Sequence, residues 1–313
     1  MVKSYPHHKV WMNGEILEPE QANVSVFSQT AMRGANVYEG LRAYRSESDG
    51  KLFVWKLDEH IERLFQSMKI MRIPSPYTPE EYKQGVLDWI HANEFEDDVH
   101  FRLVCYLGDG GSGGLKAFKA DEIDFGAIIF GGPRKHADAL ENGIDVCVSS
   151  WRRISDDVMP ARVKAGANYQ NNRLAAVEAR TNGYDDALML NRDGSLAEAT
   201  GASVMIVRDG CLITPTVTSG ILESITRKTL LAVFDQHYNV PSVQRAVDRT
   251  ELYVAEEIFC CGTAAEVTPI ISVDRIAIGD GKPGRITRDL QDKLFRAARG
   301  LDPDYIGERT AVN

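Results

Sequence analysis

The chain has 313 residues, of which 43% are hydrophobic and 26% are charged, so its composition is that of a globular protein with a sizeable core. At this length we expect two domains. The formal net charge of −9 disfavours nucleic acid as a partner. No apolar run reaches the roughly 18 residues of a membrane helix, and we expect no membrane or targeting segment. The five cysteines show no C-x-x-C spacing, and their odd number does not suggest a disulfide framework. This favours a reducing, cytoplasmic location.

The first third of the sequence predicts a hairpin followed by two helices. Asn13-Gly14 stands between apolar segments and is a strong hairpin signal. Apolar residues recur every three or four positions from Leu57 to Met71, which predicts an amphipathic helix. The segment Thr78-Pro79-Glu80-Glu81 is typical of a capping box, so a second helix begins there and runs to about Asn93. Two strand-like runs follow, FRLVCYL and FGAIIFGG.

A loop-like segment, GGPRKHADALENG, then interrupts the strand-like sequence with glycines, a proline and charges. We therefore divide the chain into three parts. They are a smaller α/β domain at 1–131, an interdomain loop at 132–141 and a larger α/β domain at 142–313.

The second half predicts further strands, hairpins and helices. A helix is expected from about Asn171 to Thr181, ended by Asn182-Gly183, and a hairpin at Asp209-Gly210. Two more helices are expected at about 224–236 and 287–299. The strand-like runs are IDVCVSSW, ALML, VQRAV, EIFCCGT and PIISV. Because hairpins and helices mix without regular βαβ alternation, the sequence predicts a mixed α and β fold, of the α+β or α/β class.

One glycine pattern favours a different hypothesis. Residues 108–113, GDGGSG, match G-x-G-x-x-G after a strand-like run, as in dinucleotide-binding oxidoreductases. That fingerprint belongs in a first βαβ unit and opens a well-formed helix. Here the pattern lies beyond residue 100 and is followed by Gly114 and a weakly periodic segment, so the context disfavours a nucleotide site.

Several polar residues stand in unusual surroundings. Lys164 and Tyr169 lie in the segment MPARVKAGANYQNN, and Glu198 lies among small residues, where a buried carboxylate needs a partner. Residues 224–226 begin a helix, whose free amides favour an anion, and Thr263 lies in a tight turn. Each feature alone has a simpler explanation, such as a solvated lysine or an N-cap serine. Together they supply the groups that hold pyridoxal phosphate (PLP) by its aldehyde, ring and phosphate.

These segments resemble the class IV, fold-type IV PLP-dependent enzymes, and within them the branched-chain amino acid aminotransferases. The resemblance runs in order from about residue 10 to residue 300. It implies a two-domain fold like that of D-amino acid aminotransferase. The segments that carry it are VYEGLRAY, LDEHIERL, KAGANYQNNRLAAVEA, LAEATGASVMIVRDGCLITP, GILESITRKTLL and CCGTAAEVTPI.

The resemblance assigns roles to individual residues. Lys164 would bind PLP covalently and act as the catalytic base. Glu198 would keep the ring nitrogen protonated, Tyr169 would bind the ring oxygen, and Leu222 would pack on the ring. The residues implied for the phosphate are Arg63, Ser224, Ile225, Thr226 and Thr263.

The resemblance also implies a substrate pocket with several departures from the family pattern. The amides of Thr263 and Ala264 would bind the α-carboxylate, and Arg102 would hold the distal carboxylate of glutamate. The other implied pocket residues are Tyr38, Arg42, Arg33 and Arg134. Arg33, His100 and Arg134 stand where tyrosines are common, Tyr38 where phenylalanine is usual, and Ser224 where glycine is usual. Two added arginines would favour an acidic or polar substrate, unless both point to solvent.

The sequence therefore predicts a PLP-dependent aminotransferase. It would move the amino group of a branched-chain L-amino acid to 2-oxoglutarate, as a homodimer or higher homo-oligomer, with no metal. The alternatives are another class IV enzyme, namely a D-amino acid or (R)-amine transaminase or a lyase, and a transaminase with a more polar substrate. The T-R-G pattern associated with the first two is absent, and YLGDGG stands in its place.

Overall fold

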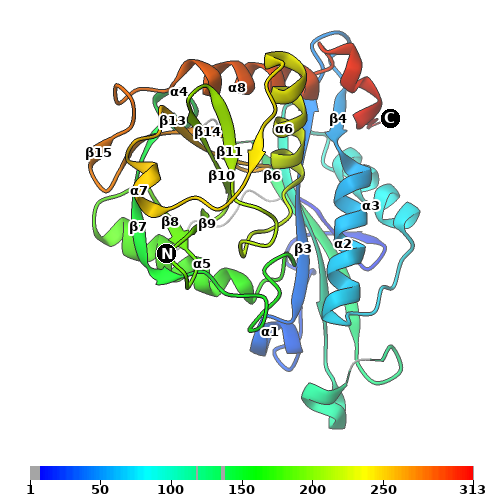
Figure 1. Cartoon of the computed structure of the whole chain (residues 1–313). Coiled ribbons are helices and arrows are strands. Elements are labelled where there is room, and N and C mark those ends of the chain that lie inside the picture. Colours follow the sequence, from blue (N-terminus) through cyan, green and yellow to red (C-terminus); the bar gives the residue numbers. More distant parts are fainter. Residues whose placement is uncertain (1–7, 118, 135–137, 313) are drawn as a thin grey trace. The chain divides into compact units, whose positions relative to one another are not determined.

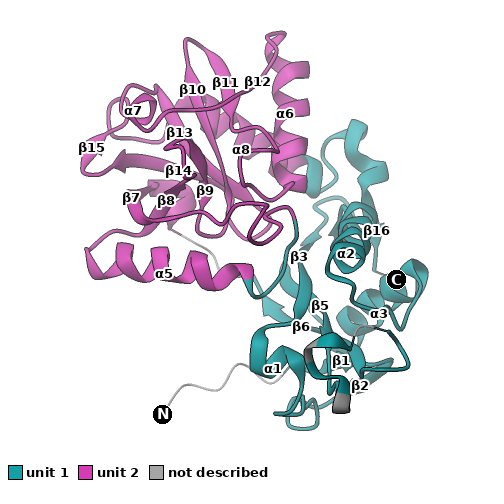
Figure 2. Cartoon of the chain, turned by 60° about the horizontal axis from the view of Figure 1, so that its bottom comes forward, with its two compact units in different colours: residues 1–135, 163–167, 297–313 teal, residues 136–162, 168–296 magenta. Residues whose placement is uncertain are grey.

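The computed structural model describes residues 8–117, 119–134 and 138–312 (Figure 1). The chain forms two compact units, coloured separately in Figure 2. Unit 1 comprises Met1–Lys135, Val163–Ala167 and Ala297–Asn313. Unit 2 comprises His136–Arg162 and Asn168–Arg296. Among the described residues, no helix combines the length and the apolar character that a membrane span requires.

Unit 1 is built on a seven-stranded sheet with the order β16-β4-β3-β5-β6-β1-β2. All of its neighbouring strands pair antiparallel. The hairpin predicted at Asn13-Gly14 is confirmed, because it joins β1 to β2 and both residues have positive φ. The strands are β1 Val10–Met12, β2 Glu15–Leu17, β3 Asn36–Arg45, β4 Leu52–Trp55, β5 Val99–Leu107, β6 Phe125–Pro133 and β16 Arg309–Ala311.

Helices α2 (Leu57–Met71) and α3 (Pro79–Ala92) confirm the two predicted helices of the first half. The capping box is formed, since the Thr78 hydroxyl accepts from Glu81 N and the Glu81 carboxylate accepts from Thr78 N. Apolar side chains of α2 and α3, including Leu64 and Trp89, pack with Leu41 and Phe101 of the sheet in one core cluster. Figure 1 shows α2 alongside β3. The shorter helical segments of unit 1 are α1 Gln29–Arg33, η1 Gly111–Lys116 and η2 Pro303–Glu308.

Residues 163–167 belong to unit 1 because their backbone continues its sheet beside β3. Ala165 forms an antiparallel bridge with Val37, and Tyr38 N donates a 2.9 Å hydrogen bond to Lys164 O. The sequence-based division assigned this lysine to the second domain. Local patterns could not reveal the difference, because only short segments of the second half, residues 163–167 and β16, join the first sheet.

The predicted interdomain loop at 132–141 has structure of its own. It includes the end of β6 at Pro133 and most of α4 (Ala139–Asn142), and residues 135–137 lie outside the described part. The principal division between the units falls after Lys135. A functional domain boundary in this segment stays a prediction.

Unit 2 is built on a nine-stranded mixed sheet with the order β12-β11-β10-β13-β14-β7-β8-β9 and β15 paired to β14. The hairpin predicted at Asp209-Gly210 is confirmed and joins β10 to β11. Strand β9, which carries Glu198, was not predicted from the local pattern, although the resemblance implied a strand at this glutamate, and β12 has only two residues of the predicted VQRAV. The strands are β7 Ile144–Arg152, β8 Asp186–Leu190, β9 Leu196–Ala199, β10 Ser203–Arg208, β11 Cys211–Thr214, β12 Val243–Gln244, β13 Glu257–Gly262, β14 Glu266–Val273 and β15 Ile276–Ala277.

The longer helices of unit 2 confirm the predicted positions within a few residues. Helix α5 begins at Asn168, three residues before the expected start. It lies in the crossover connection that joins the parallel strands β7 and β8. Its small residues Ala175 and Ala179 allow close packing on Cys147, Ala187 and Met189. The helices are α4 Ala139–Asn142, α5 Asn168–Thr181, α6 Ile225–Tyr238, α7 Arg249–Leu252 and α8 Arg285–Ala298, the last of which ends in unit 1.

The GDGGSG pattern at 108–113 lacks the structure of a dinucleotide site. It connects β5 to β6, which pair antiparallel, and it leads into the 3₁₀ segment η1. A dinucleotide fingerprint requires a parallel βαβ unit and an α-helix N-terminus. The structure therefore rules out this segment as the fingerprint of an oxidoreductase.

Candidate active site

The sheet of unit 1 has one apolar face and one polar face. The register places Gly40 opposite Arg102 and Arg42 opposite His100. Partners in an antiparallel pair project from the same face, and successive residues alternate. The buried core residues, such as Leu41 and Phe101, occupy the alternate positions. Tyr38, Arg42, His100 and Arg102 therefore share the face opposite the core, which we call the polar face.

Lys164 lies beside the polar face because its backbone pairs with Tyr38. Its Nζ is 5.0 Å from the centre of the Tyr38 ring, and the side chain is half-buried. The Arg102 guanidinium lies 5.5 Å from the same ring. The structure thus brings together three residues that the sequence assigned to the cofactor and substrate: Tyr38, Arg102 and Lys164.

Arg63 lies on the opposite side of β3, where it binds a buried carboxylate that the sequence analysis did not single out. Its Nε and Nη2 donate to Glu39 at 2.8 and 2.5 Å, and His60 Nδ1 lies 2.7 Å from the same carboxylate. Burial raises the pKa of Glu39, but the charge and hydrogen bonds of Arg63, with those of His60, outweigh it and lower the pKa to about 2. Burial lowers the pKa of His60. The pattern of Glu39 on β3 with His60 and Arg63 on one helix face could have indicated this cluster.

The two arginines that depart from the family pattern differ in their surroundings. Arg33 ends α1, is exposed in the single chain and donates from Nη1 to Gln29 Oε1 at 2.7 Å. Arg134 follows β6, and its Nη1 lies 3.8 Å from Asp98 Oδ2. The charge of Arg134 therefore has a nearby anion, which the sequence analysis did not consider.

In unit 2, Glu198 has the cationic partner that the sequence required. Arg153 Nη2 lies 2.8 Å from Glu198 Oε1, and Leu222 N donates to Glu198 Oε2 at 2.9 Å. Both charged side chains are buried. Arg153 is held in turn by Gly220 O and Asn172 Oδ1. Sequence reasoning missed Arg153, because an arginine at a strand end is usually solvated.

Three of the residues proposed for the phosphate, Ser224, Ile225 and Thr226, closely follow Leu222 in the sequence of unit 2. Ser224 is the N-cap of α6, and its hydroxyl accepts from Arg227 N. The first amides of an α-helix have no partner within the helix, so those of Ile225 and Thr226 are suited to an anion. The Thr226 side chain is buried, and that of Ser224 is half-buried.

The remaining predicted residues of unit 2 lie at a turn and on a helix. Thr263 and Ala264 form the tight turn between β13 and β14, with Thr263 half-buried and Ala264 exposed. Tyr169 is half-buried in the first turn of α5. The structure thus groups the predicted residues into one set on unit 1 and another on unit 2. The first set carries an amine and guanidinium groups, and the second a carboxylate and helix amides.

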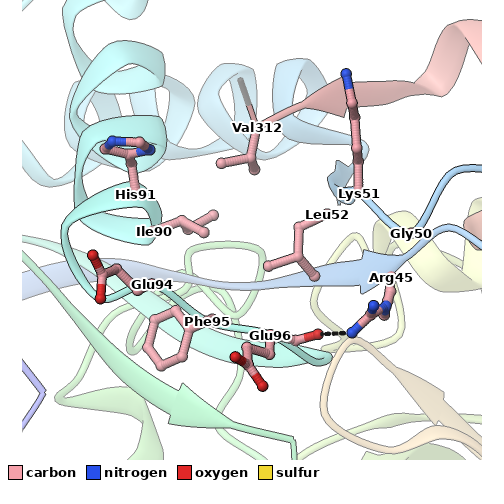
Figure 3. Close-up of a pocket in the computed structure, with 10 residues that line it drawn as sticks. All are labelled: Arg45, Gly50, Lys51, Leu52, Ile90, His91, Glu94, Phe95, Glu96 and Val312. Carbon is pink, nitrogen blue, oxygen red and sulfur yellow. Dashed lines mark hydrogen bonds between the residues drawn. The ribbon is translucent and has the colours of Figure 1, made fainter.

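A separate cavity of about 650 Å³ lies in unit 1 away from all of these residues (Figure 3). Leu52, Ile90 and Val312 turn towards its middle, whereas Lys51 turns outward. Arg45 Nη1 donates to the carbonyl of Glu96 at its edge. None of the residues predicted for the cofactor or substrate lines this cavity. The candidate functional residues therefore lie outside this cavity, in one set on the polar face of unit 1 and another set in unit 2.

Comparison with known proteins gives consistent results over nearly the whole chain. Residues 36–273 match the family model described as "Amino-transferase class IV". A probable branched-chain-amino-acid aminotransferase of Aquifex aeolicus is 35% identical over 305 residues, which is 97% of each chain. The branched-chain amino acid aminotransferase of Thermobaculum terrenum, solved in its PLP form, is 39% identical with a TM-score of 0.90 over 99% of this chain and 100% of that one. The branched-chain aminotransferase of Thermoproteus uzoniensis, solved with norvaline, is 36% identical with a TM-score of 0.91 over 98% of this chain and 100% of that one.

Proposed function

Because this chain belongs to the class IV aminotransferases, we propose that it moves the amino group of a branched-chain L-amino acid to 2-oxoglutarate with PLP as cofactor. The observation that carries the proposal is the similarity to branched-chain aminotransferases over 97% of the chain. The predicted lysine and carboxylate stand within that similarity, at Lys164 and Glu198.

The residues present fit PLP. PLP supplies an aldehyde that binds amines covalently and an electron-poor ring that stabilises negative charge on the bound amino acid. Lys164 Nζ would hold the aldehyde carbon and, once released as the free amine, would move a proton between the substrate Cα and that carbon. Glu198, already paired with Arg153 and so suited to carry a negative charge, would keep the ring nitrogen protonated. Tyr169 would donate to the ring oxygen, and Leu222 would pack on the ring.

The phosphate would bind where the chain offers donors to a dianion. The α6 amides of Ile225 and Thr226 supply two such donors, and the hydroxyls of Ser224 and Thr263 would add two more. Arg63 would add a charge-assisted contact. Its pairing with Glu39 fixes the guanidinium in place, which supports a positioning role as well.

The substrate would be held at its two ends. The amides of Thr263 and Ala264 would bind the α-carboxylate, whereas Arg102, Arg42 and Tyr38 would line the side-chain pocket. Arg134 was assigned to this pocket from the sequence, but its proximity to Asp98 reduces the positive charge that would oppose an apolar side chain. Arg33, being exposed in the single chain, fits the alternative in which it points away from the pocket.

A transaminase for a more polar substrate is the second candidate. It is favoured by the polar face itself, which carries Arg42, His100 and Arg102. A D-amino acid or (R)-amine transaminase, or a lyase, would use the same cofactor groups. We further propose a homodimer or higher homo-oligomer in the cytoplasm. The five free cysteines fit a reducing compartment.

A panel of half-reactions tests these assignments. The purified protein with bound PLP is mixed with single amino acids, and loss of the visible band of the lysine-bound cofactor is followed. Leucine, isoleucine and valine should each discharge the band, and 2-oxoglutarate should restore it. A response to D-alanine or to acidic donors alone would reject the branched-chain assignment.

Covalent attachment is tested separately. Borohydride reduction followed by peptide mass analysis should place PLP on Lys164, and Lys164→Ala should remain unlabelled. Lys228, an exposed lysine of α6, gives the matched control, because Lys228→Ala should be labelled like the wild-type protein. Labelling at another lysine would overturn the assignment.

A further inference from the structure

The His100 ring has a hydrogen bond with the Leu41 backbone, but its Nδ1 atom is buried and has no hydrogen-bond partner among the described residues. Buried polar atoms are almost always satisfied, and an exception calls for an explanation such as a ligand. The ring projects from the polar face between Arg42, which lies opposite, and Arg102, two positions along β5. The ring lies next to Gly40, where a Cβ would be in ordinary van der Waals contact with His100 Cε1 at 3.6 Å.

The surroundings of His100 are strongly cationic. Burial lowers its pKa to about 4, helped by the charges of Arg42 and Arg102 and, to a smaller extent, of Lys164. Near pH 7 the ring is therefore neutral. The carboxylate close by in sequence, Asp98 just before β5, already binds Arg299 at 2.5 Å and lies near Arg134.

Other titratable groups also face this region from the neighbouring elements. On β6, the position opposite His100 is Gly132, where a Cβ would lie 3.2 Å from His8 Cδ2. The full set is Tyr38, Arg42 and Tyr44 of β3, Asp98 and Arg102 at β5, Arg134 after β6, and His8, Lys164 and Arg299.

We propose, on the basis of the proposed function, that His100 is a specificity-determining residue that binds the side-chain carboxylate of the acidic substrate together with Arg102 by taking up a proton. An apolar side chain leaves the imidazole neutral, so no unpaired charge on the ring opposes it. A carboxylate brings a negative charge beside the ring, which favours the charged form. One proton, supplied by the buffer, then binds Nδ1, and both ring nitrogens become donors. The same pocket thereby accepts both substrates of one transamination.

Isothermal titration of the protein with bound PLP tests this with two unreactive ligands. Glutarate represents the acidic substrate, and 4-methylpentanoate represents the carbon skeleton of leucine. Titrations at about pH 6.5 in buffers of different ionisation enthalpy give the number of protons taken up on binding. The variants are His100→Gln, which cannot be protonated, and His91→Gln, an exposed histidine of α3 as the matched control.

When glutarate binds, the wild-type protein and His91→Gln should each take up as much as about one proton per chain. Binding of 4-methylpentanoate should cause no proton uptake. His100→Gln should lose this uptake and bind glutarate about tenfold or more weakly, with the affinity for 4-methylpentanoate unchanged. Absence of uptake in the wild-type protein, or unchanged glutarate binding by His100→Gln, would overturn the proposal. If leucine still discharges the cofactor band in that case, the aminotransferase assignment stands and only the role of His100 fails.

Discussion

Arg153 Nη2 lies 2.8 Å from Glu198 Oε1 in the interior of unit 2, where the two side chains are only 3% and 7% exposed. A buried carboxylate with such a partner, and with a backbone N–H from Leu222, is held in one orientation before any ligand arrives. Arg153 is thus a positioning residue for Glu198, whose carboxylate is the group we propose for the ring nitrogen of PLP.

Replacing Arg153 by methionine should leave the Glu198 charge buried without its partner. Breaking a buried pair in this way costs about 3–5 kcal/mol, so we expect a lower thermal midpoint and weaker PLP binding. Thermal unfolding and fluorescence titration with PLP measure the two effects. Arg152→Met, at the exposed neighbouring position, is the control and should change neither. If R153M matches this control, the pair has no such role.

The Glu39 cluster predicts a pH-dependent contribution to stability. The pKa of Glu39 is about 2 in the folded protein against an ordinary 4.5. A lowered carboxyl pKa stabilises the fold above the unfolded value, and the stabilisation is lost as the pH falls from about 4.5 towards 2. Glu39→Gln should therefore be less stable than wild type by about 3 kcal/mol at pH 7.

The difference between wild type and Glu39→Gln should shrink as the pH falls below about 4.5. Urea unfolding at pH 7, 5 and 4 measures it, and Glu62→Gln on the exposed side of α2 is the control. A difference that stays constant over this range would show that the charge of Glu39 is not responsible.

A substitution at Gly166 tests how the backbone positions Lys164. A Cβ at Gly166 would overlap Asn36 Oδ1, and Asn36 is held by a 2.8 Å hydrogen bond to Thr30. Gly166→Ala should therefore shift the 163–167 backbone and lower kcat, because small displacements of a catalytic group reduce rate by as much as about 100-fold. Asn36→Ala combined with Gly166→Ala should recover the kcat of Asn36→Ala alone. A double variant as slow as G166A would contradict this explanation.

The capping box of α3 gives a prediction for stability alone. Thr78→Ala removes the hydroxyl that accepts from Glu81 N, so the protein should lose about 1 kcal/mol of unfolding free energy. Thr78→Ser keeps the acceptor and should retain most of it. Chemical denaturation measures both variants, and kcat should be unaffected in each. Equal losses in T78A and T78S would show that the hydroxyl does not act as the cap.

The sequence predicted those elements whose cause is local. The hairpins at Asn13-Gly14 and Asp209-Gly210, the α2 periodicity and the Thr78 cap each depend on a few adjacent residues, and all are confirmed. The local pattern did not predict strand β9, because its four residues LAEA lack the β-branched and aromatic side chains that are typical of strands.

Long-range relationships could not be predicted in the same way. The pairing of Glu198 with Arg153, and of Glu39 with Arg63, depends on strands and helices that meet only in the folded chain. The sequence indicated that Glu198 needs a cation but could not identify it. Likewise, the environment of Arg134 follows from Asp98, which a pattern of neighbouring residues does not reveal.

The insertion of 163–167 beside β3 determines how unit 1 can be produced as an isolated fragment. A polypeptide that ends at residue 134 would lack this short segment, and the β3 backbone at Val37 and Tyr38 would lose its partner. Open strand edges recruit other chains, so such a fragment should associate with copies of itself during expression. Because the fragment also lacks β16, the partner of β4, both 163–167 and 297–313 should have to be fused to it through flexible linkers to restore a monodisperse product.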